Sequence, residues 1–320
     1  MNNIETKDAK SLHQNRNRMY KDSDLYRKSF IDPSTGIMDR IYVENRSCPV
    51  CGSSSCSEIF VKNGGIYVSC NECTMIFLNP VFKDKDLLNY YQNNNSNQAL
   101  AHESESDFYR KIYSAGLNNI AAVKREGSIL DIGCSSGFFL DIAQERKYLT
   151  HGIELNKAEI EIARTKGHSV WDIPFDRINI DNQFDIITLW DVFEHIKDGV
   201  NYLKELRSKL VSSGIVFLQI PNADSLAARI MRERCNMFDG LEHVNLYSLR
   251  TITRTANEAG FKVHSTFSII DELQPVLNYL YYEDPYNGSF SARDDFNFIV
   301  PNLIHEKYMG YKLQVILELN

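Results

Sequence analysis

Short apolar runs alternate with amphipathic segments from residue 128 to the end of the chain, and this pattern restricts the fold more than any other feature. The runs are rich in β-branched and aromatic residues, as buried strands are; they are SILDIG, THGIEL, HSVWD, FDIITLW and GIVFLQIP. The segments between them, such as FFLDIAQERK and KAEIEIARTK, carry apolar residues at helical spacing. Strands alternating with helices favour a parallel sheet covered on both faces. We therefore expect an α/β fold, whose last strands are FKVHSTFSII and YKLQVILEL.

The chain divides into four parts by composition. Residues 1–40 are polar and charged and are expected to form an arm, whereas residues 41–80 hold most of the cysteines. Residues 81–127 contain helical stretches around a low-complexity QNNNSNQ segment, which indicates a helical connector or lid. Residues 128–320 carry the alternating pattern, with an insert at 271–309 before the last strand. The length suits about two domains, at roughly 150 residues for each.

Five of the seven cysteines lie close together, in an arrangement typical of a zinc ribbon. Cys48 and Cys51 form one CxxC pair, and Cys70 and Cys73 form a second pair further along the chain. Each pair places two thiolates on one tight turn, so the two turns together complete a tetrahedral site. One CxxC pair would also suit redox chemistry, but two pairs favour a structural Zn²⁺ ion. Cys56 is an alternative ligand, which we expect to be a bystander because Cys48 and Cys51 already complete one turn.

The charge of the chain disfavours nucleic acid and anionic membranes as partners. Its 35 basic and 42 acidic residues give a formal net charge of −7. Residues 41–80 hold two basic and three acidic residues, so the cysteine-rich segment lacks excess positive charge for phosphate binding. No apolar run approaches the roughly 20 residues of a membrane span, and the first residues lack a signal peptide's apolar core. With an odd cysteine count, these features predict a cytoplasmic protein without a disulfide framework and leave its oligomeric state open.

A glycine-containing turn, DIGCSSG, follows the first strand of the alternating pattern and runs from Asp131 to Gly137. Glycines between a strand and a helix let a ligand approach the backbone near the helix N-terminus. Glu154 ends the second strand, where a carboxylate can accept hydrogen bonds from both ribose hydroxyls. A dinucleotide is disfavoured because the GxGxxG pattern fails after Gly133 and because Asp131 would repel a pyrophosphate. S-adenosylmethionine, a nucleoside that has an ammonium group and no phosphate, suits these residues better.

DIGCSSG closely resembles motif I of class I S-adenosylmethionine-dependent methyltransferases, and the resemblance extends over roughly residues 125–270 and the last strand. It implies a Rossmann-like fold with a seven-stranded, mostly parallel sheet and helices on both faces, preceded here by the zinc ribbon. It also implies that the motif I backbone and acid hold the methionine moiety, that the next acid binds ribose, and that the acid after the third strand receives the adenine amino group. The cofactor-binding positions implied are Asp131, Gly133, Cys134, Gly137, Glu154, Asp172 and Asp191. Ser135 departs from the pattern, since many members have glycine there.

The cysteine-rich segment carries a second resemblance. CPVCG, followed by CxxC and the segment IFLNP, looks like the zinc-binding region that precedes certain bacterial sugar methyltransferases. These enzymes act on nucleotide-linked sugars or related small acceptors in surface-polysaccharide and natural-product pathways. The resemblance implies a small acceptor, with a sugar nucleotide or glycan precursor as the expected class, and leaves O- and C-methylation open. The alternatives are an RNA or protein acceptor recognised by the ribbon, and a non-catalytic scaffold that binds the cofactor.

Methyl transfer to a hydroxyl benefits from a general base, and the candidates follow the fourth and fifth strands. His195 ends the segment WDVFEH and His243 lies in GLEHVNLY, so both are expected near the carboxyl ends of the strands. A histidine that only buttresses a loop is the alternative for each. Asp191, Glu194 and His195 are also an alternative divalent-cation site, because they resemble an ExxEH run in some quinone-precursor methyltransferases. Glu242 is a further candidate acid or base.

The insert at 271–309 is rich in aromatic side chains and carries two cations. These residues are Tyr279, Tyr281, Tyr282, Tyr286, Phe290, Phe296 and Phe298, with Arg293 and Lys307. They suit a substrate cap that stacks on a sugar or base and neutralises a phosphate, and a small satellite core is the alternative. Tyr90, Tyr91 and Tyr113 are candidates for a lid.

Overall fold

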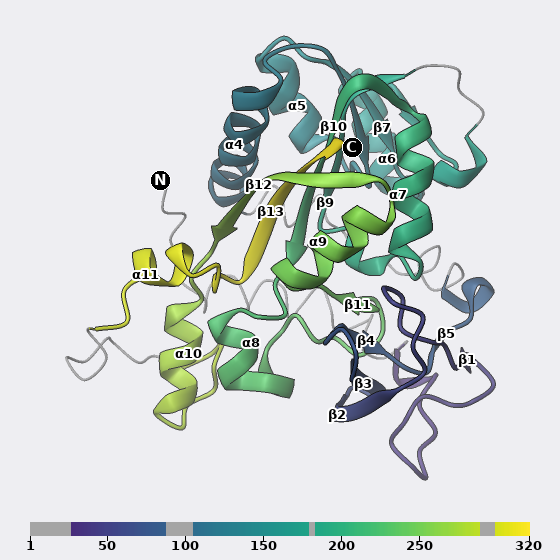
Figure 1. Ribbon diagram of the computed structural model, residues 1–320, viewed down its shortest axis with the longest axis vertical. Coiled ribbons are helices and arrows are strands. Elements are labelled where there is room, and N and C mark those ends of the chain that lie inside the picture. Colours follow the sequence, from purple (N-terminus) through teal and green to yellow (C-terminus); the bar gives the residue numbers. More distant parts are fainter. Residues whose placement is uncertain (1–26, 88–104, 179–182, 289–297) are drawn as a thin grey trace.

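The structure, a computed structural model, describes residues 27–87, 105–178, 183–288 and 298–320. Its centre is a seven-stranded sheet in the order β12-β13-β10-β9-β6-β7-β8 (Figure 1). The strands are β6 (Ser128–Ile132), β7 (Leu149–Ile153), β8 (Val170–Trp171), β9 (Phe184–Trp190), β10 (Leu210–Pro221), β12 (Phe261–Ile269) and β13 (Lys312–Leu319). Neighbours pair in parallel from β8 to β10, whereas β13 pairs antiparallel with β10 and β12. The expected α/β fold with a seven-stranded, mostly parallel sheet is confirmed.

The central strands form where apolar side chains run continuously along the sequence, because both faces of the sheet are covered. Along β9, Ile186 and Ile187 are both fully buried yet belong to different core clusters. β6 alternates in the same way, since Ile129 shares a cluster with Ile186 and Leu130 shares one with Ile187. Burial of each such side chain contributes about 1.5–3 kcal/mol relative to exposure, so the two clusters hold the strands in register.

Helices cover both faces of the sheet (Figure 1). One core cluster includes buried residues of α4 (Ser106–Val123), α5 (Phe138–Glu145) and α6 (Lys157–Thr165). The other cluster includes buried residues of α7 (Gly199–Ser208) and α9 (Leu249–Glu258). The chain therefore has the three layers of helix, sheet and helix that the alternating sequence predicts.

α4 packs on the sheet, although the sequence places it in a connector. Leu117 and Ile120 on this helix are fully buried. A Cβ atom at Gly116 would meet the indole of Trp190 at 2.3 Å, so the helix backbone lies directly on β9. Tyr113, a candidate lid residue, packs edge-on against the same indole, with ring centroids 4.8 Å apart. We therefore propose that the domain containing the sheet begins before α4 and not at β6.

The cysteine-rich segment forms a small antiparallel sheet that is completed from far along the chain. Its strands are β2 (Cys56–Lys62), β3 (Gly65–Cys70) and β4 (Ile76–Leu78), with β11 (Asn245–Leu246) paired to β4 at the edge. Two further short strands, β1 (Val43–Glu44) and β5 (Val81–Phe82), pair with each other. Because β11 comes from the segment between β10 and α9, we propose that the ribbon folds together with the larger domain.

α8 (Leu226–Met231) and α10 (Leu273–Leu280) pack against each other near the ribbon (Figure 1). Their buried residues share a cluster with Tyr67 of β3. Tyr286 of the insert is 8% exposed in this cluster, as a satellite core requires, whereas Tyr282 is fully exposed. α11 (Pro301–Glu306) follows and leads to β13. The candidates that lie outside the described residues are Tyr90, Tyr91, Phe290, Arg293 and Phe296.

The described end of the expected arm, residues 27–40, packs against the chain that follows it. Phe30 and Met38 are buried in a cluster with Val43 of β1 and Phe82 of β5. This end of the arm therefore belongs to the folded structure. Across the four described stretches, none of the helices combines the length and the apolar composition that crossing a bilayer requires.

Candidate functional site

The turn between β6 and α5, residues 133–137, is called the glycine turn below. Gly133 and Gly137 have φ angles of 76° and 79°, in the left-handed region that favours glycine. Side chains would also be excluded there by packing, because a Cβ atom at Gly133 would meet Val192 at 2.6 Å and one at Gly137 would meet His168 at 2.5 Å. Ser135 takes φ 48° without being glycine, which costs of order 1–3 kcal/mol. The backbone of the turn is therefore fixed in a strained conformation at the carboxyl edge of the sheet.

Asp131 precedes this turn and is buried at 1% exposure. Its Oδ1 accepts a hydrogen bond of 2.6 Å from the Thr188 hydroxyl on the neighbouring strand β9. Burial raises the pKa of Asp131 to about 8, although the hydrogen bond from Thr188 opposes that rise. At neutral pH the carboxyl group is therefore mostly uncharged, and it can gain a charge when a cation binds beside it. Thr188 has no counterpart in the sequence prediction.

Glu154 follows β7 and ties the glycine turn to the second strand. Its Oε2 accepts a hydrogen bond of 2.8 Å from the Ser135 amide, and its Oε1 accepts from the amides of Leu155 and Asn156 at 2.7 and 2.8 Å. Burial raises the pKa of Glu154, and these backbone donors oppose the rise. A carboxylate offers about four lone pairs, so acceptor capacity remains for a hydroxyl ligand. Glu154 therefore fits a ribose-binding position beside the turn.

Cys134 and Asp172, two other predicted cofactor residues, make contacts within the protein that do not point to a ligand. The Cys134 thiol is buried in the core, where a Cβ atom at Gly152 would come within 2.4 Å of its sulfur. Its backbone amide donates to the carbonyl of Ile153, so the residue closes the turn against β7. Asp172 follows β8 with a side chain 61% exposed, and its carboxylate lies 3.7 Å from Arg164. Neither contact tests the cofactor roles, which stay predictions.

Asp191 follows β9 and is engaged from two strands. Its Oδ2 accepts a hydrogen bond of 3.0 Å from the side chain of Gln219 on β10 and forms an ion pair with Lys312. Lys312 begins β13, which runs antiparallel to β10, so its side chain reaches the same edge of the sheet. The sequence prediction missed Lys312 because the direction of a strand is not visible in its apolar pattern. The resulting ion pair fixes the carboxylate next to the expected cofactor site.

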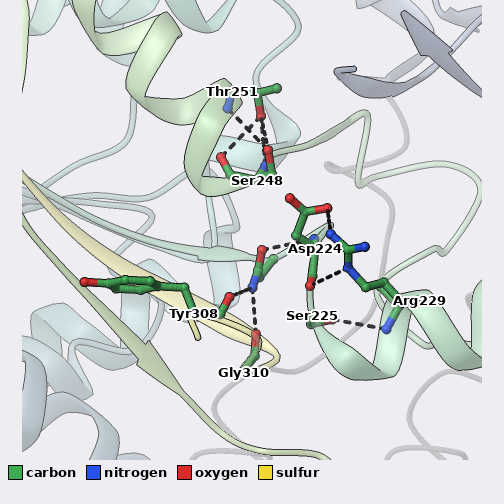
Figure 2. Close-up of polar contacts among 9 residues, drawn as sticks. Asp224, Ser225, Arg229, Ser248, Thr251, Tyr308 and Gly310 are labelled. Carbon is green, nitrogen blue, oxygen red and sulfur yellow. Dashed lines mark hydrogen bonds and ion pairs between the residues drawn. The ribbon is translucent and has the colours of Figure 1, made fainter. Parts of the chain in front are cut away.

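Polar contacts also fix the chain just before Lys312 (Figure 2). The Asn222 side chain, buried after β10, donates to the carbonyls of Tyr308 and Gly310 at 2.8 and 2.9 Å. Ser225 caps the N-terminus of α8 by accepting a hydrogen bond from the backbone three residues on. The Asn222 contacts hold the end of β10 against the segment that leads into β13 and therefore support the position of Lys312.

The two predicted catalytic histidines meet at this edge. His195 ends a short 3-10 helix (Phe193–His195), and its ring centroid lies 5.0 Å from that of His243, at 81° between the planes. Burial, and secondarily the neighbouring His243, lower the pKa of His195 to about 3. His243 Nδ1 lies 2.7 Å from the carbonyl of Met237, which can only accept, so Nδ1 carries the proton. Nε2 of a neutral His243 therefore presents a lone pair.

Glu194 lies beside the histidine pair with a side chain 1% exposed. Neither carboxylate oxygen has a hydrogen-bond partner among the described residues, and Oε1 lies 3.9 Å from His243 Nε2. Burial and then the charge of Asp191 raise the pKa of Glu194 well above its ordinary value. Ligand atoms of Glu194, His195 and His243 lie within 4.8 Å of one another, a spacing compatible with a divalent cation. Asp191, expected in such a group from the sequence, is not part of it.

Asp239 shapes the loop that carries His243. Its carboxylate accepts hydrogen bonds from the backbone amides of Leu241, Glu242 and His243, at 2.9 to 3.1 Å through Oδ1. Burial opposes ionisation of Asp239, but the positive charge that His243 carries when it is protonated, together with these backbone donors, holds the pKa of Asp239 below its ordinary value. The carboxylate therefore pins three successive amides, and this fixes the backbone on which His243 stands.

The four predicted zinc ligands come together at one end of the ribbon. Sγ atoms of Cys48, Cys51, Cys70 and Cys73 all lie within 4.8 Å of one another. The Cys48–Cys73 and Cys51–Cys70 sulfur distances are both 3.5 Å, close to the ~3.8 Å that separates thiolates bound tetrahedrally to zinc. Cys56 is not a member of this group. The donor set therefore fits a closed structural zinc site.

Part of the chain matches a known protein family. The family model described as a methyltransferase domain matches residues 104–266, just over half of the 320 residues. The matched range includes the glycine turn and Glu154, together with both histidines. It ends before α10 and the last strand, and it begins after the ribbon.

Similarity to individual proteins is weaker and mostly partial. Ubiquinone biosynthesis O-methyltransferase of Histophilus somni (strain 2336) is 24% identical over 109 residues, which cover 30% of this chain and 46% of that protein. An uncharacterised protein of Methanocaldococcus jannaschii is 24% identical over 168 residues, covering 50% of this chain and 78% of that protein. This chain spans about half the length of the O-methyltransferases that it matches. A possible histamine N-methyltransferase of Thermotoga maritima superposes with a TM-score of 0.48 and 16% identity, over 69% of this chain and 95% of that one.

Proposed function

This chain belongs to the methyltransferase-domain family, and we propose that it transfers a methyl group from S-adenosylmethionine to a small acceptor. The observation that carries the proposal is the pairing of a buried acid and a ribose-type acid around one strained turn. Asp131 is buried two residues before the glycine turn, and Glu154 accepts a hydrogen bond from the backbone amide of Ser135 within the turn. A ligand that has both an ammonium group and a ribose suits this pair.

The cofactor roles rest on the resemblance to class I methyltransferases, and the charges and donors around Asp131 and Glu154 support them. Asp131 would hold the ammonium group, because a nearby cation stabilises its charged form, and the backbone of Gly133, Cys134 and Gly137 would lie along the methionine moiety. Glu154 would accept the ribose hydroxyls, and Asp172 would accept the adenine amino group. The last of these positions, Asp191, is held by Lys312 and would face the methyl-donor end. When bound, S-adenosylmethionine supplies a methyl group on an already activated sulfonium.

The protein's own tasks are to align the acceptor, exclude water and take up the acceptor's proton. We assign the proton to Nε2 of His243, because Nδ1 already donates to Met237 and because 23% of this side chain is accessible. With S-adenosylmethionine bound, the acceptor oxygen would then take the methyl group, and the broken carbon–sulfur bond would leave S-adenosylhomocysteine. His195 packs edge-on against His243 and would hold its ring in place.

For the acceptor we propose a nucleotide-linked sugar or another glycan precursor. Support comes from the resemblance of the cysteine-rich segment to the zinc-binding region of sugar methyltransferases, and from the net charge of −7, which disfavours RNA. The Histophilus relative, named as a ubiquinone biosynthesis O-methyltransferase, favours a phenolic quinone precursor as a second candidate. Both candidates are small acceptors with a hydroxyl group.

A methyl-transfer screen with isotopically labelled S-adenosylmethionine tests this proposal. Nucleoside diphosphate sugars, phenolic quinone precursors, total RNA and mixed proteins form the four arms, and mass spectrometry locates the methyl group. We expect label in a sugar nucleotide. Label only in the phenolic precursors would show that the acceptor is a phenol and not a sugar, while methyl transfer to a small acceptor would still hold. Label in RNA or protein would overturn the small-acceptor proposal, and tight cofactor binding without transfer in any arm would favour a non-catalytic scaffold.

A further inference from the structure

The loop that carries His243, residues 237–245, is built against the ribbon and not only against the large sheet. Tyr67 of β3 is fully buried, and its hydroxyl bridges two backbone groups of this loop. The amide of Gly240 donates to the hydroxyl at 3.2 Å, and the hydroxyl donates to the carbonyl of His243 at 3.2 Å. One ribbon side chain therefore holds both sides of the turn that presents the proposed base.

The backbones of the ribbon and of this loop also lie in direct contact. A Cβ atom at Gly240 would come within 2.0 Å of the Lys62 carbonyl oxygen, and one at Gly65 would come within 2.2 Å of the Gly240 carbonyl oxygen. No side chain fits between the two segments at these points. The amide of Leu78 on β4 donates to the carbonyl of Val244 at 3.0 Å, just before β11 joins the ribbon sheet. Movement of the ribbon would therefore move the loop.

Arg46 connects the ribbon to the loops of both histidines. Its Nη2 donates to the carbonyl of Val244 at 2.7 Å and to the side chain of Asn245 at 2.9 Å. Its Nη1 donates to the carbonyl of Lys197, two residues after His195, at 3.1 Å. The side-chain amide (Nδ2) of Asn245 in turn donates to the carbonyl of Ile196 at 2.6 Å. One guanidinium group thus fixes the spacing between the two histidine-bearing segments.

The candidate zinc ligands lie next to these two residues in the sequence. Arg46 stands two positions before Cys48, and Tyr67 stands three positions before Cys70 at the end of β3. Cys48, Cys70 and Cys73 are buried in a core cluster shared with the large sheet, and a zinc ion held by the four cysteines would add rigidity to the short segments around them. By joining the turns around Cys48 and Cys70, that ion would stiffen the chain beside Arg46 and Tyr67.

We propose that the ribbon is a working part of the active site, in which Tyr67 and Arg46 are positioning residues for His243. This inference rests on the proposed function, because the position of His243 affects turnover only if His243 is the general base. The ribbon then sets the turnover rate through the geometry of the base and does not recognise the acceptor by charge. A displacement of about 1 Å at a reacting group can cost about a hundredfold in rate, so modest loosening is measurable.

Tyr67→Phe is the sharpest variant, because it keeps the buried ring and removes only the hydroxyl. We expect kcat to fall about tenfold or more, with unchanged affinity for S-adenosylmethionine. Tyr148→Phe is the matched control, since Tyr148 is 4% exposed and its hydroxyl donates to the Lys124 carbonyl at 2.8 Å, within the large domain. It should leave kcat unchanged. Arg46→Lys, which keeps the charge but not the several donors, is a second variant should Tyr67→Phe fail to fold.

A double-mutant cycle with His243→Ala separates positioning from general stabilisation. If Tyr67 acts through His243, its loss should have no further effect on kcat once the imidazole is gone. Additive losses, or a Tyr67→Phe enzyme as fast as wild type while His243→Ala is slow, would overturn the inference but keep the proposed function. Wild-type turnover by His243→Ala would instead overturn the proposed base.

A spectroscopic measurement tests the same inference without an acceptor. In protein labelled with ¹⁵N-histidine, His243 should give the signature of a single tautomer protonated at Nδ1, assigned by its absence from His243→Ala. Tyr67→Phe should replace that signature with mixed tautomers, and Tyr148→Phe should not. An unchanged His243 spectrum in both Tyr67→Phe and Arg46→Lys would contradict the positioning role.

Discussion

Asp131 shows how one residue can couple ligand binding to protonation. It is buried, accepts a hydrogen bond from Thr188, and has a pKa raised to about 8 by burial. An acid in this state is neutral at pH 7 in the free protein and becomes charged when a cation compensates for desolvation. Asp131 therefore suits a ligand that carries a positive charge, such as an ammonium group.

We expect S-adenosylmethionine binding to release a proton from Asp131. At pH 7 the group lies below its pKa of about 8 and is mostly protonated; the ligand's ammonium group favours the carboxylate and lowers that pKa. Binding should release about one proton, measured by calorimetry in buffers of different ionisation enthalpy. Asp131→Asn should release none. Equal proton release by the two proteins would contradict the role of Asp131.

Glu154→Gln should weaken S-adenosylmethionine binding by about 10- to 100-fold, because a neutral amide replaces a carboxylate that accepts charge-assisted hydrogen bonds. Titration calorimetry measures the change directly. Glu145→Gln, at an exposed position on α5, is the matched control and should bind normally. If Glu154→Gln binds as tightly as wild type, the ribose contact lies elsewhere.

At the scale of elements, the ribbon depends on its four thiols. Cys70→Ser should lose bound zinc and lower the thermal midpoint of the full chain, because a three-ligand site binds more weakly and binding energy is folding energy here. Zinc content by elemental mass spectrometry and thermal unfolding check this. Cys56→Ser, which changes a thiol outside the group, should keep its zinc. If Cys70→Ser kept its full zinc content and Cys56→Ser lost zinc, Cys56 would be the ligand and Cys70 the bystander.

The long strands could be predicted because their burial on both faces leaves continuous apolar runs. β9 is an example, since FDIITLW coincides with Phe184–Trp190. β11 could not be predicted, because its two residues pair with β4 through backbone bonds that leave no local pattern. α4 was predicted as a helix, but its packing on Trp190 depends on a contact between distant segments. Local periodicity thus predicts elements better than it predicts which of them belong to one core.

Across the whole molecule, the site is made from pairs that lie far apart in the sequence. Asp131 could be proposed from motif I and Glu154 from its place at the end of the second strand, and the cysteine spacing predicted the group that the structure brings together. The partners Thr188, Lys312 and Tyr67 could not, because each meets its site residue from another strand. Sequence patterns predict the groups that carry chemistry, whereas the groups that position them become visible only in the fold.

We propose that the sheet binds the cofactor and that the ribbon fixes the base. Methyl transfer itself is tested most directly by incubating the purified full chain with methyl-labelled S-adenosylmethionine and a panel of nucleoside diphosphate sugars. Mass spectrometry quantifies the methylated acceptor and S-adenosylhomocysteine. We expect a methylated sugar nucleotide and S-adenosylhomocysteine in equal amounts. Turnover-free binding, or S-adenosylhomocysteine formed without any methylated acceptor, would contradict this expectation.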